Sequence, residues 1–424
     1  MTTASAAIGH GAGPAPDRAA GRERIVIVGG GLAGHAAAER LREAGFTGTL
    51  TIIGEEPHLP YNRTPLSKQL LTGEYALADL PLRSFTDLNV TWRLGCRALA
   101  LDPNARTIRL GGAEQIGYDG LVIATGVEAR VLPGVPMHSE RIHMLRTLGD
   151  AHRIDQALRR ASGRLLIVGG GFIGAELAST ARARGLDATI IDVSSTLLTR
   201  ALGHVLGAAA GDLHRDHGVR LHLGVGVSGW QAHGAGVQLQ LADGEVLDGD
   251  AAVVGIGTVA RTEWLTGSAL DCTDGVLAGP TCHAVGADDI VVAGDIARWP
   301  NLLFDTTPRR VEHWINAAEM GRHAADSLLA GPQQAAPFTP VPRFWSEQHG
   351  VKIQSVGLPT LGSDVRIVHG DLASQRFVAA YTQPTATGDR LMRVVAFDDP
   401  RRLLAYAPLV GKTVTASPAS SAAA

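Results

Sequence analysis

The sequence predicts an α/β protein built around two parallel sheets, and three observations carry that prediction. A pattern of strand, glycine-rich turn, helix and strand occurs twice, at residues 24–56 and 164–194. Each copy opens with an apolar run typical of a buried parallel strand. Each copy also contains glycines in the spacing GxGxxG and has an acidic residue at or just past the end of its second strand. At 424 residues the chain is long enough for two or three domains.

The glycine spacing in both copies is typical of a Rossmann-like dinucleotide-binding unit. The first glycine permits a tight turn, the second lets a pyrophosphate approach the backbone, and the third lets the helix pack on the strand. The helix amino terminus then faces the phosphates. These glycines are Gly29, Gly31 and Gly34 in the first copy and Gly169, Gly171 and Gly174 in the second. The expected ribose-binding acids are Glu55, or its neighbour Glu56, and Asp192.

Two such units in one chain suggest two different dinucleotides, FAD and a nicotinamide nucleotide, between which a hydride can pass. Asp192 would bond a ribose 2′-hydroxyl and repel a 2′-phosphate. Residues 193–196 contain no arginine, so NADH is expected rather than NADPH. A solvated acid at a strand end is the structural alternative for Asp192.

Two further segments assign the first unit to FAD. The run "YDGLVIATG" (118–126) reads as a strand ending at Ala124, Thr125 and Gly126, and "DDIVVAGDIAR" (288–298) reads as a strand followed by Asp295. In flavoproteins with two dinucleotides, the second pattern carries the Asp that holds the ribityl chain of FAD. The expected fold is therefore glutathione-reductase-like, with a discontinuous FAD domain and a carboxy-terminal α+β interface domain. The expected boundaries are a disordered tail at 1–22, the FAD domain at 23–130 and 262–336, the NAD domain at 131–261, the interface domain at 337–412, and a disordered tail at 413–424.

Composition and charge exclude several other classes. A net charge of −3 argues against non-specific nucleic-acid binding. The three cysteines, Cys96, Cys272 and Cys282, lie far apart, which suggests neither a metal site nor a disulfide framework. No apolar run of about 18 residues occurs, and residues 1–22 lack an apolar signal-peptide core. No membrane association and a cytoplasmic location are expected.

The segment "PYNRTPLSK" (60–68) stands out because its two prolines rule out a regular helix or a central strand. It ends in Lys68, one of only three lysines in an arginine-rich chain. Dithiol flavoenzymes carry redox cysteines in this region, soon after the first ribose acid. No cysteine lies between Gly29 and Val90 here, so a dithiol relay is excluded.

Several motifs together resemble the oxygenase-coupled NADH-dependent ferredoxin reductases, a family of putidaredoxin reductase-like FAD/NAD flavoproteins. They are "PYNRTPLSK", "GGGFIGAE", "VVAGDIAR", "RVEHWINAAEMGR" and "FWSEQHGVKIQSVG". The resemblance covers residues 23–412 in order and spacing. It implies electron transfer from NADH through FAD to an acidic iron–sulfur ferredoxin that serves a haem-thiolate monooxygenase or a Rieske dioxygenase. The segment "GTVART" (257–262) departs from the family's usual Gly-x-x-Pro-Asn.

The resemblance also implies roles for individual residues. Lys68, Glu176 and Phe172 are the expected catalytic residues: Lys68 beside the flavin, Glu176 paired with it, and Phe172 covering the flavin face. Each has a structural alternative, namely a surface lysine, a helix first-turn acid and core packing. The other residues expected at FAD are Leu32, Ala33, Glu55, Arg63, Ala98, Arg146, Asp295 and Trp314, with Trp345 at the flavin edge. On the nicotinamide side, Gly171, Ile173, Asp192 and Gly257 are expected.

Residues 309–331 read as one helix, with Pro308 suited to its first position and Gly331 and Pro332 ending it. The family resemblance implies that the amino end of this helix points at the flavin. A ferredoxin would be steered by a basic rim, for which Arg309, Arg310, Arg322 and Arg343 are candidates against the alternative of solvated helix arginines. Two other functions stay open: reduction of rubredoxin, a quinone or monodehydroascorbate, and a slow FAD/NAD-binding sensor similar to apoptosis-inducing factor.

Overall fold

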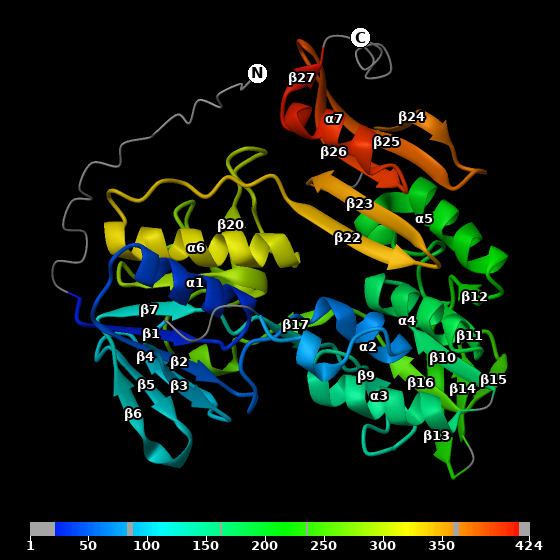
Figure 1. Ribbon diagram of the computed structural model, residues 1–424, viewed down its shortest axis with the longest axis horizontal. Coiled ribbons are helices and arrows are strands. Elements are labelled where there is room, and N and C mark those ends of the chain that lie inside the picture. Colours follow the sequence, from blue (N-terminus) through cyan, green and yellow to red (C-terminus); the bar gives the residue numbers. More distant parts are fainter. Residues whose placement is uncertain (1–21, 83–87, 162, 235, 359–363, 415–424) are drawn as a thin grey trace, which may run out of the picture.

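The computed structural model describes residues 22–82, 88–161, 163–234, 236–358 and 364–414. Figure 1 shows two α/β parts side by side, with a carboxy-terminal sheet lying above them. The expected tail at 1–22 lies outside the described residues except for Arg22. The predicted fold class, two Rossmann-like parts and a third domain, is confirmed.

The first parallel sheet has the strand order β19-β7-β1-β2-β3. Its central strand β1 pairs in parallel with both β2 and β7, and the apolar runs of all three are almost fully buried. Strand β19 joins this sheet from far along the chain, so the first part is discontinuous in sequence. The strands are β1 Arg24–Val28, β2 Thr49–Gly54, β3 Thr91–Leu94, β7 Gly120–Ile123 and β19 Ile290–Val292.

Helices α1 (Leu32–Glu43) and α6 (Trp314–Ala330) pack closely against each other on this sheet (Figure 1). Gly321 allows the contact, because a Cβ there would lie 2.2 Å from the carbonyl oxygen of Ala33. The short helix α2 (Gln69–Thr72) follows the proline-rich loop. Two small sheets complete this part. An antiparallel sheet consists of β4 Ala98–Asp102, β5 Thr107–Leu110 and β6 Gln115–Gly117, and a mixed sheet consists of β18 Val276–Leu277, β20 Ala297–Pro300 and β21 Pro308–Arg309.

The second parallel sheet has the order β12-β11-β10-β16-β9 and repeats the pattern of the first. A three-stranded antiparallel sheet, β13-β14-β15, accompanies it. The strands are β9 Ile142–Met144, β10 Arg164–Val168, β11 Asp187–Asp192, β12 Arg220–Leu223, β13 Val227–His233, β14 Gly236–Leu241, β15 Val246–Gly249 and β16 Ala251–Val254. The helices are α3 Leu148–Arg160, α4 Phe172–Ala183 and α5 Thr199–Asp216.

The chain passes between the two α/β parts twice, and the two crossings pair with each other. Strands β8 (Val127–Ala129) and β17 (Thr258–Ala260) form an antiparallel ribbon there. Their position agrees with the expected crossings near residues 130 and 262, although the boundaries themselves stay predictions.

The carboxy-terminal part is a mostly antiparallel sheet with the order β22-β23-β26-β25-β24 and one helix, α7 (Pro400–Tyr406). Both faces of this sheet are apolar and join different cores: Val378 and Val394 belong to the first core, and their strand neighbours Phe377 and Val395, which point to the opposite face, belong to the second. The strands are β22 Arg343–Gln348, β23 Val351–Gly357, β24 Asp364–Asp371, β25 Arg376–Thr385, β26 Gly388–Phe397 and β27 Thr413–Val414.

Two sequence-based predictions need correction. Residues 413 and 414, expected in the disordered tail, form β27 and pair with β26; residues 415–424 lie outside the described part. The helix expected from residue 309 begins at Trp314 instead. Pro308 does not open a helix, because residues 308–309 pair with β20 as β21. The predicted end is confirmed, with Gly331 as the carboxy-terminal cap at φ +77°.

Candidate active site

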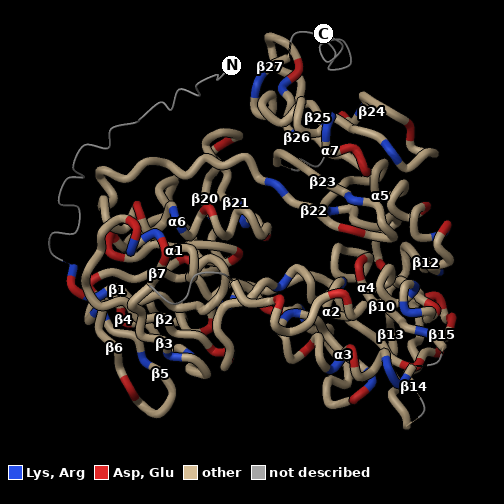
Figure 2. The backbone as a smooth tube through the Cα atoms, viewed as in Figure 1, with Lys and Arg blue, Asp and Glu red and all other residues tan. Residues whose placement is uncertain are grey.

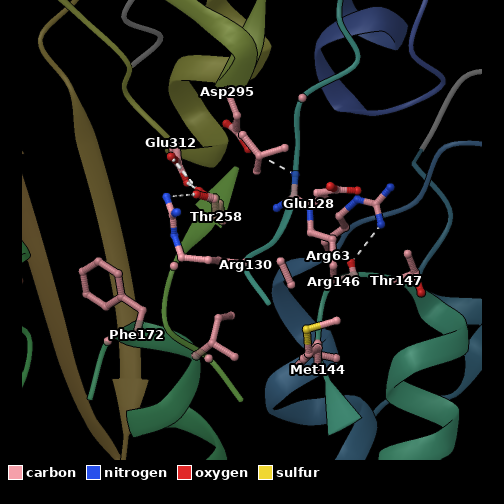
Figure 3. Close-up of a pocket in the computed structure, with 18 of the residues that line it drawn as sticks. Arg63, Glu128, Arg130, Met144, Arg146, Thr147, Phe172, Thr258, Asp295 and Glu312 are labelled. Atoms are coloured by element: carbon pink, nitrogen blue, oxygen red, sulfur yellow. Dashed lines mark hydrogen bonds and ion pairs between the residues drawn. The ribbon is translucent and has the colours of Figure 1, made fainter. Parts of the chain in front are cut away.

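A single cavity of about 1370 Å³ runs between the two α/β parts. Both glycine turns line it, and so do all of the expected site residues except Gly34 and Gly174. Residues as far apart in sequence as Gly29 and Trp345 thus line one space. In Figure 3, Phe172 lies on one side of the cavity and Arg63, Arg146 and Thr147 on the other, with Asp295 between elements of the first part. The structure thus brings the expected residues together around one cavity, and their individual roles stay predictions.

The first glycine turn has the geometry that a bound pyrophosphate needs. Gly29 has φ +126°, and a Cβ there would lie 2.1 Å from the carbonyl oxygen of Ala124. A Cβ on Gly34 would lie 2.1 Å from the oxygen of Gly29, whereas Gly31 has open space before it. Two glycines therefore let the backbone pack, and the third leaves room for a ligand at the start of α1.

The second turn repeats these distances. Gly169 has φ +114° and would place a Cβ 2.3 Å from the oxygen of Gly255, while a Cβ on Gly174 would lie 1.9 Å from the oxygen of Gly169. Gly171 again faces open space at the start of α4. The two turns thus form two cradles of the same design, which fits two dinucleotides in one cavity.

The acids that follow the two turns are held differently. The Asp192 carboxylate accepts hydrogen bonds from the backbone N–H groups of Gly170 and Ser194. Its structural counterpart in the first sheet is Gly54, because Ile53 and Ile191 are paired alike in their sheets. Glu55 lies one residue further on and forms ion pairs with Arg261 and, at 3.9 Å, with Arg97.

The alternative acid Glu56 belongs to the wall of the proline-rich loop. It accepts a hydrogen bond from the Tyr61 hydroxyl at 2.6 Å and is also bound by the Arg63 guanidinium. Arg63 in turn donates to the backbone oxygen of Arg146 at 2.9 Å (Figure 3). These contacts hold Glu56 within the wall of the loop. Glu55, which is paired with arginines at the cavity edge, is therefore the acid that remains available to bind a ligand.

The predicted pairing of Lys68 with Glu176 is present. The Lys68 Nζ lies 2.8 Å from Glu176 Oε2, with side chains 14 % and 6 % exposed. Residues Thr64–Ser67 form a short 3₁₀ turn that directs Lys68 toward α4. The Thr180 hydroxyl on α4 donates to the backbone oxygen of Ser67 at 2.7 Å, which fixes this loop on the second part. A mostly buried cation thus stands between the two glycine turns, and its catalytic role stays a prediction.

Asp295 belongs to the first α/β part and lies in a short turn that follows β19. Its carboxylate contacts the Arg146 guanidinium at 3.2 Å, so two expected FAD contacts touch each other. Burial raises the pKa of Asp295, although Arg146 acts in the opposite direction. This carboxylate is placed to accept hydrogen bonds from ligand hydroxyl groups, and their donation would compensate its desolvation.

The expected aromatic residues form two contacts across domain boundaries. Phe172 packs edge-on against Phe344 of β22, with ring centroids 4.7 Å apart. Trp314 and Trp345 form a similar pair at 6.1 Å, and the buried Trp314 Nε1 has no hydrogen-bond partner. These two pairs therefore join α4 and α6 to β22 at the cavity wall.

Sequence analysis missed several cavity residues. Thr258 in the atypical "GTVART" segment donates to both carboxylate oxygens of Glu312, at 2.9 and 2.7 Å (Figure 3). His313 precedes α6, and burial lowers its pKa to about 4. Glu312 and His313 were hidden by the wrong helix start, which placed both residues inside a helix. Ser346 contacts Glu176 from the third domain, and no local pattern signals that contact.

The described ranges hold neither a membrane-spanning helix nor a metal-binding cluster. No helix in these ranges is long and apolar enough to cross a bilayer. No group of three or more His, Cys, Asp or Glu side chains in the same ranges could hold a metal ion. All three cysteines are described and free; Cys96 lines the cavity beside Gly54, and Cys272 and Cys282 do not.

Comparison with known proteins agrees with this geometry. Residues 23–321 match the family model described as pyridine nucleotide-disulphide oxidoreductase, and residues 343–424 match the one described as reductase C-terminal. Rhodocoxin reductase of Rhodococcus erythropolis is 33% identical over 94% of this chain and 92% of its own length.

A second relative, the ferredoxin–NAD(+) reductase component of the p-cumate 2,3-dioxygenase system of Pseudomonas putida, is 37% identical over 82% of this chain and 84% of its own. The crystal structure of the covalent putidaredoxin reductase–putidaredoxin complex superposes with a TM-score of 0.87 at 29% identity, covering 93% of this chain and 94% of that one. The chain therefore belongs to the pyridine nucleotide-disulphide oxidoreductase family.

Proposed function

We propose that this protein is an FAD-dependent NADH:ferredoxin oxidoreductase. The observation that carries the proposal is a single cavity with two dinucleotide cradles and a Lys68–Glu176 ion pair between them. The net reaction converts NADH and two oxidised ferredoxins to NAD⁺, two reduced ferredoxins and a proton. The names of relatives such as the dioxygenase component support ferredoxin as the acceptor and an oxygenase as its destination.

FAD fits the first cradle and NADH the second. Gly29, Gly31 and Gly34 would hold the FAD pyrophosphate at the start of α1, with Glu55 at the adenosine ribose and Asp295 at the ribityl hydroxyls. Gly169, Gly171 and Gly174 would hold the NADH pyrophosphate, with Asp192 at its ribose. When bound, FAD accepts a hydride from NADH and supplies single electrons to a one-electron acceptor.

The protein's contribution to that chemistry is charge and position. Lys68 brings a compact positive charge to the space between the cradles, where negative charge develops on reduction. The first-turn N–H groups of α6, beginning at Trp314, add the positive end of a helix dipole to the same cavity. Phe172, at the first position of α4 and backed by Phe344, would cover the face of a bound flavin ring.

The ferredoxin surface is less sharply defined than the cofactor site. Figure 2 shows basic and acidic residues mixed over all three parts of the chain. Each candidate docking arginine has an acidic neighbour: Asp305 for Arg309, Asp274 and Glu312 for Arg310, Glu43 for Arg322 and Glu319 for Arg343. Arg310 is also only 12 % exposed, so its ion pairs serve the cavity wall. Arg343, which is 47 % exposed beside β22, is the better choice for a docking test.

The test is anaerobic mixing of the FAD-loaded protein with NADH, followed by addition of a [2Fe–2S] ferredoxin. The proposal expects rapid bleaching of the flavin and then reduction of ferredoxin. Rapid bleaching with no electron transfer to any ferredoxin, but transfer to rubredoxin or a quinone, would favour another acceptor. Bleaching over minutes with a persistent long-wavelength band would favour the sensor function instead.

Two coarser proposals accompany this one. The boundaries 23–130 with 262–336 and 131–261 are supported by the membership of each sheet, as is a third domain that starts at 337 and includes β27 at 413–414. A cytoplasmic location is supported by the dependence on NADH, which is a cytoplasmic reductant.

A further inference from the structure

Glu176 stands at the inner end of a hydrogen-bond chain that crosses between domains. The Ser346 hydroxyl on β22 donates to Glu176 Oε1 at 2.6 Å, while Oε2 is bound by Lys68 Nζ at 2.8 Å and by the Ser67 hydroxyl at 2.5 Å. The Gln348 amide nitrogen donates to Ser346 Oγ at 3.0 Å. Its amide oxygen lies 3.0 Å from Nε2 of His214 on α5. His214 Nδ1 lies 3.0 Å from Nε2 of His349, which follows β22.

The chemistry of these groups gives the chain one direction. An amide oxygen can only accept, so His214 must carry its proton on Nε2 and leave Nδ1 bare. His349 Nε2 must then donate to that bare nitrogen. Every hydrogen in the chain therefore points toward the Glu176 carboxylate, to which Ser346 donates.

The chain is also buried, which makes each link costly to break. Ser346, Gln348 and His214 are fully buried, and Glu176 is 4 % exposed. Burial lowers the pKa of His214 to about 4 and that of His349 to about 3, so both rings are neutral near pH 7, as the chain requires. A buried donor or acceptor that loses its partner is strongly unfavourable.

The same chain is a poor route for protons. A glutamine side chain accepts a hydrogen bond at its amide oxygen and donates one from its amide nitrogen, but it has no ionisable proton at neutral pH. The chain therefore acts on where Glu176 lies and how its charge is held, not on proton transfer.

We propose that Ser346, Gln348, His214 and His349 are positioning residues that fix the Glu176 carboxylate and, through it, the Lys68 ammonium group. This inference rests on the proposed function of the Lys68–Glu176 pair. It makes the third domain part of the hydride-transfer site, because a contact from β22 orients a residue of α4 that binds a loop of the first part.

Two substitutions test the chain on the full FAD-loaded protein. Ser346→Ala removes the donor to Glu176 Oε1, and Gln348→Met removes the amide at nearly constant volume. Each is expected to lower the limiting rate of flavin reduction by NADH about tenfold, as loss of a hydrogen bond to a charged group implies. The dissociation constant of NADH should change less than about twofold, and Ser346→Thr, which keeps the hydroxyl, should restore most of the rate.

The matched control is Asp216→Ala. It removes an exposed contact that also joins the third domain to α5, the 2.7 Å hydrogen bond from Gln375, which precedes β25, to Asp216 at the end of α5. Its flavin reduction rate should equal that of the wild type. Wild-type rates in both Ser346→Ala and Gln348→Met, beside a slow Lys68→Ala variant, would overturn the proposal.

A second measurement reads the chain directly, without turnover. Long-range ¹H–¹⁵N NMR of ¹⁵N-histidine-labelled protein should show His214 as the Nε2–H tautomer in the wild type and a changed signal in Gln348→Met. An Nδ1–H tautomer for His214 in the wild type would overturn the chain. If Lys68→Ala keeps the wild-type rate, the proposed role of the ion pair fails instead, and the NMR result still decides whether the chain exists.

Discussion

The two glycine repeats share a backbone but differ in what their side chains do. At the turns they are nearly interchangeable, with matching positive φ values at Gly29 and Gly169 and open space at Gly31 and Gly171. Beyond the turns they diverge. Helix α1 packs under α6, and Gly321 and Gly294 both lie so close to Ala33 that a Cβ on either glycine would clash with it. Helix α4 instead presents Phe172 to the cavity and Glu176 to Lys68.

This difference shows how one binding unit serves two roles. The first repeat is closed over by α6 and suits a tightly held cofactor. The second repeat keeps an aromatic side chain and an ion pair at the start of its helix, which suits a substrate that enters and leaves. The predictions below test that division, beginning with the effect that should be largest.

The glycines of the first turn should separate folding from binding. Gly29→Ala forces a Cβ to within 2.1 Å of the Ala124 oxygen at φ +126°, so the first part should not fold stably. Gly31→Ala meets no protein atom within 4 Å and should keep the wild-type melting profile of the apoprotein while losing FAD. Flavin absorbance after gel filtration measures retention; a yellow Gly29→Ala protein would contradict the steric account.

Removal of Lys68 should have the next largest effect. Lys68→Ala deletes the cation between the cradles and is expected to slow flavin reduction by NADH about 10- to 100-fold, in line with loss of a preorganised charge. Lys352→Ala, an exposed lysine of the third domain, is the control and should behave as wild type. Stopped-flow absorbance gives the rate, and wild-type reduction with full FAD retention would refute the role of Lys68.

The acids after the two turns should affect different ligands. Asp192→Ala should lower the preference for NADH over NADPH about tenfold, because the carboxylate that repels a 2′-phosphate is gone. Glu55→Gln should leave that preference unchanged and alter FAD retention alone. Steady-state kcat/KM with both nucleotides measures the ratio. An equal loss of preference in both variants would break the distinction between the repeats.

Acidification should lower the stability of the α/β part that contains the second glycine repeat. The folded-state pKa of His214 lies near 4, below its ordinary value of 6.5, so the unfolded chain binds more protons between these values. The contribution of His214 to the free energy of unfolding is therefore fully present above about pH 6.5 and is lost as the pH drops toward 4. This loss should lower the melting temperature by roughly 5 °C. His214→Gln should reduce this slope, whereas His138→Gln, at an exposed position, should not. Identical slopes in all three proteins would contradict the assignment.

The sequence predicted what local patterns encode. Both repeats, the end of α6 at Gly331 and the pairing of Lys68 with Glu176 followed from spacing and resemblance. The start of α6 was wrong because Pro308 suits both a helix start and an edge strand, and pairing with β20 decides between them. The Ser346–Glu176 contact joins residues 170 positions apart, so only the folded chain reveals it.

The central claim is that electrons leave from the flavin itself, without a disulfide relay. The matched family is described as disulphide oxidoreductases. The three cysteines of this chain are nevertheless free, and the loop that ends in Lys68 contains no cysteine. An anaerobic titration of the FAD-loaded protein with NADH tests this claim most directly. We predict complete reduction at one NADH per flavin. An end point at two NADH per flavin would reveal a second two-electron centre and would contradict the account.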